Sequence, residues 1–150
     1  MKIDKKIKIL NDLIAKNYDS EKGYLEAANQ VEDDRLIALF NEMAKQRYDF
    51  GHELKDEIRR LDGDIKTGDT VASKVHRAWM NLRGALAGNE AEAILEEVKI
   101  GEKNALNNYQ EAIAEFPGRG PAYNTLVRQR ALIEDSARKI GRMIPEYTDT

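Results

Sequence analysis

Apolar side chains recur every three or four residues through most of this chain of 150 residues, and only three prolines interrupt the pattern. That spacing is the period of an amphipathic α-helix, and no stretch shows the two-residue alternation of a strand. Pro121 suits the first turn of a helix, and Pro145 is expected to end that helix. The sequence therefore predicts an all-α protein. The pattern predicts long helices over about residues 3–30, 33–61, 90–116 and 121–144, and a shorter helix over about 71–87.

The lengths of the connections indicate how these helices are arranged. "VEDD" near residue 32 and "FPGRGP" near residue 118 are short, so the helices that they join should form antiparallel hairpins. The stretch 62–89 is long enough to travel the whole length of a bundle. Two hairpins joined by one long crossover make a ferritin-like four-helix bundle, which we predict as a single domain over residues 1–150. The alternative is an up-and-down bundle in which residues 71–87 pack as a full fifth member.

Composition excludes several classes of function. The chain has no cysteine, which excludes disulfides, thiolate zinc sites, iron–sulfur clusters and cysteine nucleophiles. The net charge is −3 with both signs interspersed, so there is no basic field that would attract nucleic acid. No apolar run is long enough to span a bilayer, and the first residues lack the pattern of a secretion signal. We therefore expect a cytoplasmic protein with no nucleic-acid and no membrane partner.

One of the two histidines, His52, stands three residues after Asp49. Residues at this spacing are neighbours on a helix, and in helical bundles such a pair can hold iron, manganese or zinc. However, at about 100° per residue both side chains fall opposite the apolar stripe that contains Phe40, Met43 and Leu54. The pair is therefore interpreted as a solvated surface pair.

The same helical phase turns several charged and amide side chains inward. If the third long helix starts beside the first connection, these residues form two layers about 6 Å apart, a gap that an arginine can span. Buried charges are rarely tolerated unless they are paired, so we expect a mid-bundle network of three carboxylates and two guanidiniums. The expected members are Glu21, Arg47, Glu102, Arg130, Glu134 and Asn17.

The inward carboxylates leave a metal site as an alternative. Ferritin-like di-iron sites use a glutamate from each of two helices and a Glu-x-x-His motif from each of the other two. Here Ala137 stands where the motif that begins at Glu134 needs histidine, and the second motif lacks its imidazole as well. We therefore expect no cofactor. The alternatives are iron or manganese held by Glu21, Glu102 and Glu134, or a single-metal or small-anion site.

Four stretches resemble an uncharacterised bacterial ferritin-like family, distantly similar to rubrerythrin-like proteins, whose members carry a domain of unknown function. They are "LNDLIAKNYDSEKGYLEAA", "LFNEMAKQRYDFGHEL", "VHRAWMNLRGALAGNEAEAILEE" and "LVRQR". The resemblance runs from about residue 5 to 143, and "HRAWMNLRGALAG" is its most specific piece. It implies a ferritin-like bundle with residues 71–87 as a crossover helix, and no established activity. Many similar members have histidine where Ala137 stands, which further weakens a metal role.

The short helix at 71–87 supplies a candidate interface. One of its stripes combines aromatic, methionine and arginine side chains, which are enriched at protein interfaces, so we expect a homodimer. The residues concerned are His76, Trp79, Met80 and Arg83; the alternative is that Trp79 lies at the helix edge and the others are ordinary surface. The function that we expect is that of a non-enzymatic ferritin-like bundle with a structural or stress-related role. The alternative function is that of a degenerate iron- or manganese-dependent oxidase or storage protein.

Overall fold

A computed structural model of the chain describes residues 2–66, 84, 88 and 90–148. These residues form four long helices and contain no strand, so the all-α prediction is confirmed. The bounds of the four long helices agree with the predicted ranges to within one residue at every end. The helices are α1 (Ile3–Gln30), α2 (Asp34–Arg60), α4 (Ala91–Glu115) and α5 (Pro121–Met143), followed by the short 3₁₀ helix η1 (Ile144–Tyr147).

Local sequence signals explain where the helices begin and end. Asp33 caps α2, because its Oδ1 accepts hydrogen bonds from the backbone N–H groups of Arg35 (2.9 Å) and Leu36 (3.1 Å). Gly120, with a φ of 104°, turns the chain into α5, and Pro121 opens that helix. The α-helix α5 ends at Met143, just before Pro145, as predicted. The chain then continues as the short 3₁₀ helix η1, because proline is compatible with the first turn of a new helical segment.

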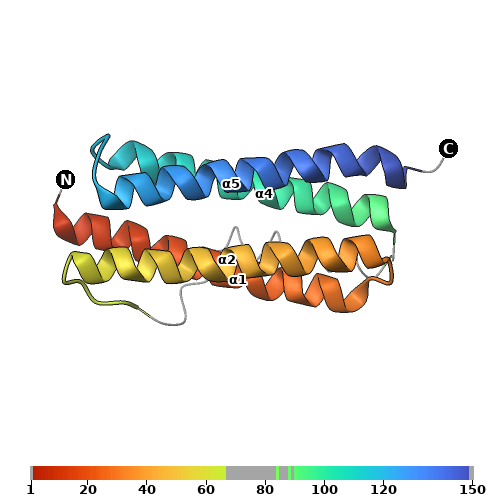
Figure 1. Ribbon diagram of the computed structural model, residues 1–150, viewed down its shortest axis with the longest axis horizontal. Helices are drawn as coiled ribbons and strands as arrows, with labels where there is room; N and C mark the ends of the chain where they lie inside the picture. The colour runs from red at the N-terminus through yellow and green to blue at the C-terminus, as the bar shows by residue number, and fades with distance from the viewer. Residues whose placement is uncertain (1, 67–83, 85–87, 89, 149–150) are drawn as a thin grey trace.

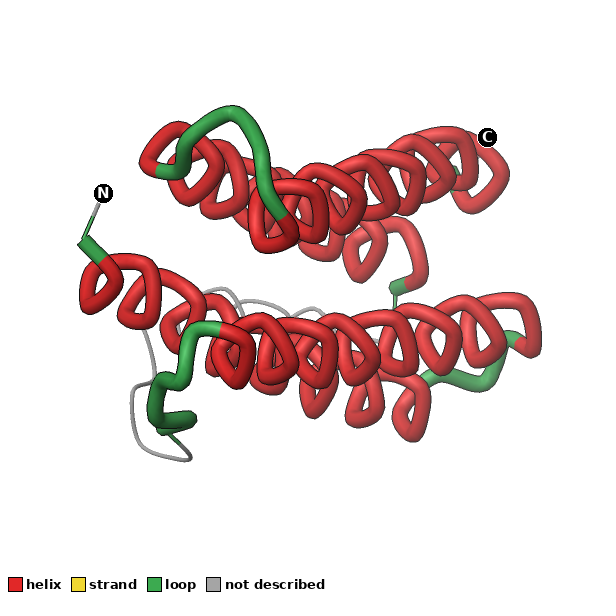
Figure 2. Tube along the Cα trace, turned by 60° about the vertical axis from the view of Figure 1, so that its left-hand side comes forward, coloured by secondary structure: helices red, strands yellow, loops and turns green. Residues whose placement is uncertain are grey.

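The four helices form two antiparallel hairpins that lie against each other (Figures 1 and 2). One hairpin is α1 with α2, and the other is α4 with α5. Figure 1 shows that α2 and α4 run in the same direction, so the end of α2 and the start of α4 lie at opposite ends of the bundle. The predicted helix at 71–87 falls outside the described residues, apart from the single position Gly84.

Apolar side chains fill the interior in two clusters, one toward each end of the bundle. The first cluster brings the α1–α2 connection together with the start of α4 and the end of α5. The start of α4 therefore lies beside the first connection, which is the placement assumed when the inward polar residues were divided into two layers. The second cluster joins the other halves of the same four helices. Representative members are Val31, Leu36, Ile94 and Ile140 in the first cluster, and Leu10, Leu54, Phe116 and Leu126 in the second.

α1 and α2 pack closely where the ring of Tyr18 lies against Gly51. A Cβ atom on Gly51 would lie only 2.3 Å from Cε1 and 2.7 Å from Cζ of that ring. A side chain at Gly51 would therefore have to displace the tyrosine. The same ring has its centroid 6.0 Å from that of His52 and 4.8 Å from Nζ of Lys55.

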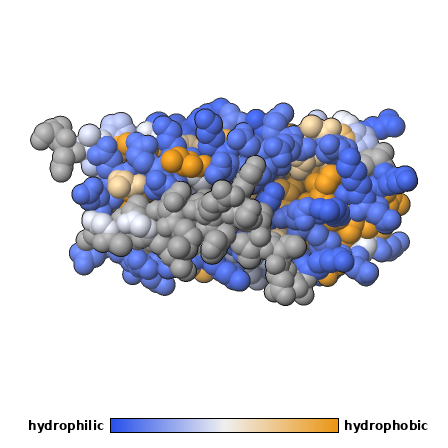
Figure 3. All heavy atoms as spheres, turned by 180° about the vertical axis from the view of Figure 1, so that it is seen from behind, coloured by the Kyte–Doolittle hydropathy of each residue, from blue (hydrophilic) through white to orange (hydrophobic). Residues whose placement is uncertain are grey.

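None of the helices in the described part of the chain combines the length and the apolar character needed to cross a membrane. In the view of Figure 3, hydrophilic side chains cover most of the coloured surface, and apolar side chains appear between them in small groups.

Candidate functional site

Midway along the bundle, between the two apolar clusters, lies an ion pair that is shielded from solvent. Nη2 of Arg47 on α2 donates to both carboxylate oxygens of Glu102 on α4, at 2.7 and 2.6 Å. Arg47 is 1% exposed and Glu102 is 0% exposed. The hydroxyl of Tyr24 on α1 donates to the same carboxylate, and the guanidinium lies over the Tyr24 ring, 5.6 Å from its centroid. The buried carboxylate is thus satisfied by charged and neutral donors from two other helices.

A second set of hydrogen bonds, made by neutral groups, adjoins the ion pair. Nδ2 of Asn17 donates to the Tyr109 hydroxyl at 2.9 Å, and that hydroxyl donates to Oε1 of Gln129 at 2.6 Å. Nε2 of Gln129 then donates to the backbone oxygen of Phe50 at 3.2 Å. These four residues come one from each long helix. The chain of bonds therefore ties α1, α4, α5 and α2 together across the interior. We call the residues that contribute polar side chains to this region the polar layer: Asn17, Tyr24, Arg47, Glu102, Tyr109 and Gln129.

The electrostatics of the polar layer follow from burial and from the ion pair. Burial disfavours the charged form of Arg47, but the nearby Glu102 carboxylate outweighs that effect and raises the pKa of the guanidinium. Burial, with the negative charge of Glu102 as the next cause, raises the pKa of Tyr24 well above its ordinary value. Burial also raises the pKa of Tyr109. Both tyrosines therefore remain neutral hydrogen-bond donors, and the arginine remains charged.

The structure brings together only part of the predicted network. Arg47 and Glu102 pair directly, and Asn17 lies in the adjoining hydrogen-bond chain. Glu21 is only half-buried and forms no ion pair with Arg47 among the described residues. The expectation that it joins the network is wrong, because a second carboxylate beside Glu102 would exceed the charge that one guanidinium can compensate. At this level of α1 the neutral donor Tyr24 occupies the core instead.

The two predicted members on α5 also lie outside the polar layer. Arg130 and Glu134 form an ion pair of 3.5 Å with each other, with side chains 37% and 35% exposed. Glu134 is bound by Arg138 as well. The prediction that Arg130 reaches the central carboxylate is therefore wrong, because its guanidinium is directed along its own helix toward solvent-accessible partners. The buried polar residue of α5 is its neighbour, Gln129.

Three members of the polar layer were not among the predicted site residues. They are Tyr24, Tyr109 and Gln129, and each is 2% exposed or less. Tyr109 lies at helical spacing from Val98 and Ala112 on the apolar face of α4. A buried tyrosine usually finds a hydrogen-bond partner for its hydroxyl, so the presence of tyrosines on inward stripes was the available signal.

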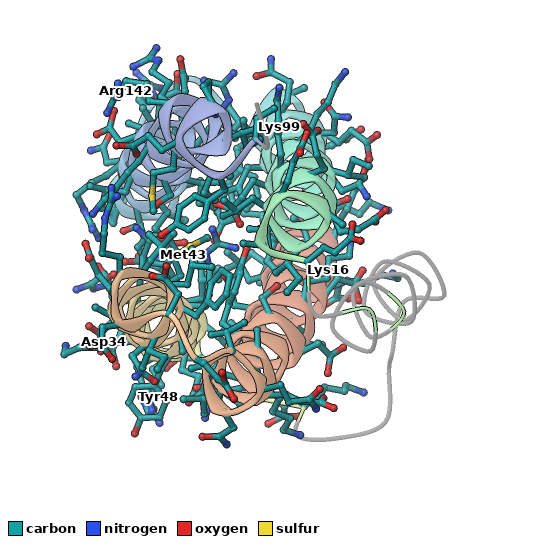
Figure 4. The ribbon with its side chains drawn as sticks, turned by 90° about the vertical axis from the view of Figure 1, so that its right-hand side faces the viewer. Lys16, Asp34, Met43, Tyr48, Lys99 and Arg142 are labelled. Atoms are coloured by element: carbon teal, nitrogen blue, oxygen red, sulfur yellow. The ribbon has the colours of Figure 1, made fainter. Side chains whose placement is uncertain are left out.

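The remaining predicted sites divide into one surface pair and one set that lies outside the described residues. Asp49 binds Nζ of Lys45 at 2.8 Å, and His52 is exposed beside Tyr48, with ring centroids 4.4 Å apart. The outward placement of this pair is thus confirmed. Figure 4, which looks along the bundle, shows Tyr48 pointing outward and Met43 pointing inward. The candidate interface residues His76, Trp79, Met80 and Arg83 are not among the residues that the structure describes.

The described residues do not fit a di-metal centre. Among residues 2–66 and 90–148, no group of three or more histidine and carboxylate side chains is arranged to hold a metal ion. Glu102, the only fully buried carboxylate of the alternative metal set, has both oxygens bound by Arg47. Glu21 and Glu134 lie apart from it, so the expected set of three carboxylates does not assemble.

Together, the fold and the polar layer define an all-helical bundle with a salt-bridged interior. Residues 5–115 match the family model described as "Domain of unknown function (DUF2383)". The chain belongs to this family. The match covers α1, α2 and α4, and with them the Arg47–Glu102 pair and Tyr24. A search of curated proteins gave no match.

Proposed function

We propose that this chain is a non-enzymatic helical bundle of ferritin-like arrangement, in which an ion pair occupies the position of a metal centre. The observation that carries the proposal is the geometry of Glu102. Its two oxygens accept hydrogen bonds of 2.7 and 2.6 Å from one guanidinium nitrogen in a site closed to solvent. The guanidinium supplies the positive charge that an inward carboxylate requires. Because this charge belongs to a side chain of the protein, no metal ion has to supply it.

The ferritin-like arrangement is supported by the directions of the helices. α2 and α4 run parallel, so the chain between them has its two described ends at opposite ends of the bundle (Figure 1). A four-helix bundle with one long crossover of this kind has the ferritin-like topology. The proposed role of such a bundle is structural or stress-related, and it does not depend on redox chemistry.

Metal analysis tests the proposal directly. The full chain is purified without chelator or added metal, analysed for iron and manganese, and then titrated with each ion under anaerobic conditions. We expect substoichiometric metal in both cases, and no increase in melting temperature on titration. Stoichiometric iron or manganese that is lost in Glu102→Gln but retained in Glu96→Gln would overturn the proposal. Glu96 is a suitable control because it is an exposed carboxylate on the same helix.

A further inference from the structure

A cavity lies between α1 and α4, directly beside the polar layer. Its volume is about 150 Å³. Leu13, Val98 and Ala105 give it apolar walls, and the buried side chains of Arg47 and Asn17 also line it. A cavity of this size is on the order of that needed for one six-membered ring. Figure 4 places Lys16, which also lines the cavity, at the side where α1 faces α4.

Arg47 brings an unused hydrogen-bond donor to this cavity. Its Nη2 binds Glu102 and its Nε donates to Oε1 of Gln46 at 3.1 Å, whereas Nη1 has no acceptor among the described residues. Among the described residues, two fully buried polar side-chain atoms lack a hydrogen-bond partner, namely the Tyr18 hydroxyl and Nε of Arg130. Nη1 of Arg47 is not one of them, and Arg47 is among the residues that line the cavity.

Asn17 brings an unused acceptor to the same cavity. Its Nδ2 donates to the backbone oxygen of Leu13 and to the Tyr109 hydroxyl, both at 2.9 Å. Because the Leu13 oxygen can only accept, the nitrogen of the amide must face it, which leaves Oδ1 as the free end. Oδ1 has no donor among the described residues, although Asn17 is only 4% exposed. Two buried residues thus bring a donor and an acceptor to one cavity, and neither atom has a partner among the described residues.

The charge of the site determines what can bind there. Glu102 already neutralises Arg47, so an anionic ligand would place a second carboxylate next to the first in a low dielectric, which is unfavourable. A cation would offer the guanidinium no acceptor. We propose that the cavity binds a small neutral molecule that carries a carboxamide on an apolar body of about one ring. The carboxamide oxygen accepts from Nη1 of Arg47, its N–H donates to Oδ1 of Asn17, and the ring lies against Leu13, Val98 and Ala105.

Three probes of nearly equal shape test this proposal. Benzamide offers an acceptor and a donor, benzoate offers acceptors and a negative charge, and benzamidine offers donors and a positive charge. Binding to the full chain is measured by ¹H–¹⁵N correlation spectra, with shifts expected at residues 16–20 and 101–109. We expect benzamide to bind saturably. Benzoate and benzamidine should each bind at least about tenfold more weakly than benzamide, because each loses one or more of the hydrogen bonds.

Two glycines supply a matched pair of variants. Gly101 lines the cavity and Gly141 does not, and both are helical residues at which a Cβ atom would meet nothing within 4 Å. Gly101→Leu should fill the cavity and weaken benzamide binding by about tenfold, whereas Gly141→Leu should leave it within about twofold. Arg47→Lys, which keeps a charge opposite Glu102 but lacks Nη1, should weaken binding as Gly101→Leu does.

Absence of benzamide binding would overturn the proposal and assign the cavity to water. Equal binding of the three probes, or equal binding by the two glycine variants, would also overturn it.

The inference depends on the proposed function only through the position of the Arg47–Glu102 pair. The two can fail separately, because Gly101→Leu leaves that pair in place. Stoichiometric metal would refute the proposed function, whereas a chain free of metal that does not bind benzamide would refute the ligand alone.

Discussion

Replacing Arg47 with alanine tests whether the ion pair is as critical to folding as its burial indicates. The substitution removes both hydrogen bonds to Glu102 and leaves a carboxylate that is 0% exposed with the Tyr24 hydroxyl as its remaining donor in the polar layer. Breaking a buried pair by removing one partner costs about 3–5 kcal/mol, which is a large fraction of the stability of an ordinary domain. We therefore expect Arg47→Ala to lower the free energy of unfolding by at least about 3 kcal/mol. Urea unfolding followed by far-UV circular dichroism measures this value.

The control is another arginine on the same helix. Arg59 pairs with Asp56 at 2.8 Å, but both side chains are more than 60% exposed, so Arg59→Ala should change the free energy of unfolding by at most about 0.5 kcal/mol. A second test replaces both partners, as Arg47→Met with Glu102→Leu. This double variant should be more stable than Arg47→Ala, because no buried charge remains unpaired. Equal losses in Arg47→Ala and Arg59→Ala, or a double variant less stable than Arg47→Ala, would refute the reasoning.

Three further predictions concern the tyrosines, the glycines and a helix cap. Burial raises the pKa of Tyr24 and Tyr109. As the pH rises, these tyrosines therefore lose their protons in the unfolded chain before they do so in the folded chain. Above about pH 10 the free energy of unfolding should fall by on the order of 1 kcal/mol per pH unit for each tyrosine. Urea unfolding at pH 9 to 11 should show a shallower fall in Tyr109→Phe, and an identical fall would contradict the assignment. Gly51→Ala should lower the free energy of unfolding by about 1–3 kcal/mol, because the new methyl group collides with the Tyr18 ring. Gly101→Ala should raise it by about 0.5–1 kcal/mol, because no atom lies near the new methyl group and alanine favours the helix. Melting temperatures that shift in the same direction in both variants would contradict this prediction. Asp33→Ala should cost about 1 kcal/mol by removing the cap of α2, and unchanged stability in urea would show that the cap is dispensable.

The helices could be predicted from the sequence because their signals are local and repeated. The apolar period of α1 recurs from Ile3 to Ala28, with Asn17 and Glu21 as polar interruptions, and the turn sequence at Gly120 and Pro121 marks the start of α5. The inward position of Arg47 was predictable for the same reason. On α2, Phe40, Met43 and Leu54 define one narrow face, and Arg47 lies within it.

The helical period could not predict which polar residue of α5, Gln129 or Arg130, enters the polar layer. The three fully buried apolar residues of that helix are Leu126, Ile133 and Ile140. At about 100° per residue, Gln129 lies about 40° to one side of their mean direction and Arg130 about 60° to the other. A difference this small is decided by the neighbouring helices, which offer the Phe50 carbonyl to an amide. The identities of hydrogen-bond partners depend on tertiary packing, and the periodicity of one helix carries no information about that packing.

The polar layer also limits how the two hairpins can slide past each other. A shift of α4 by one turn, about 5.4 Å along the axis, would place Val98 or Leu106 opposite Arg47 in the position that Glu102 now holds. Neither side chain can accept a hydrogen bond, so the guanidinium would be left buried and without its counter-charge. Apolar contacts alone would tolerate such a shift far better, because they have no direction and one apolar side chain can replace another. The Arg47–Glu102 pair therefore selects a single axial register for the bundle.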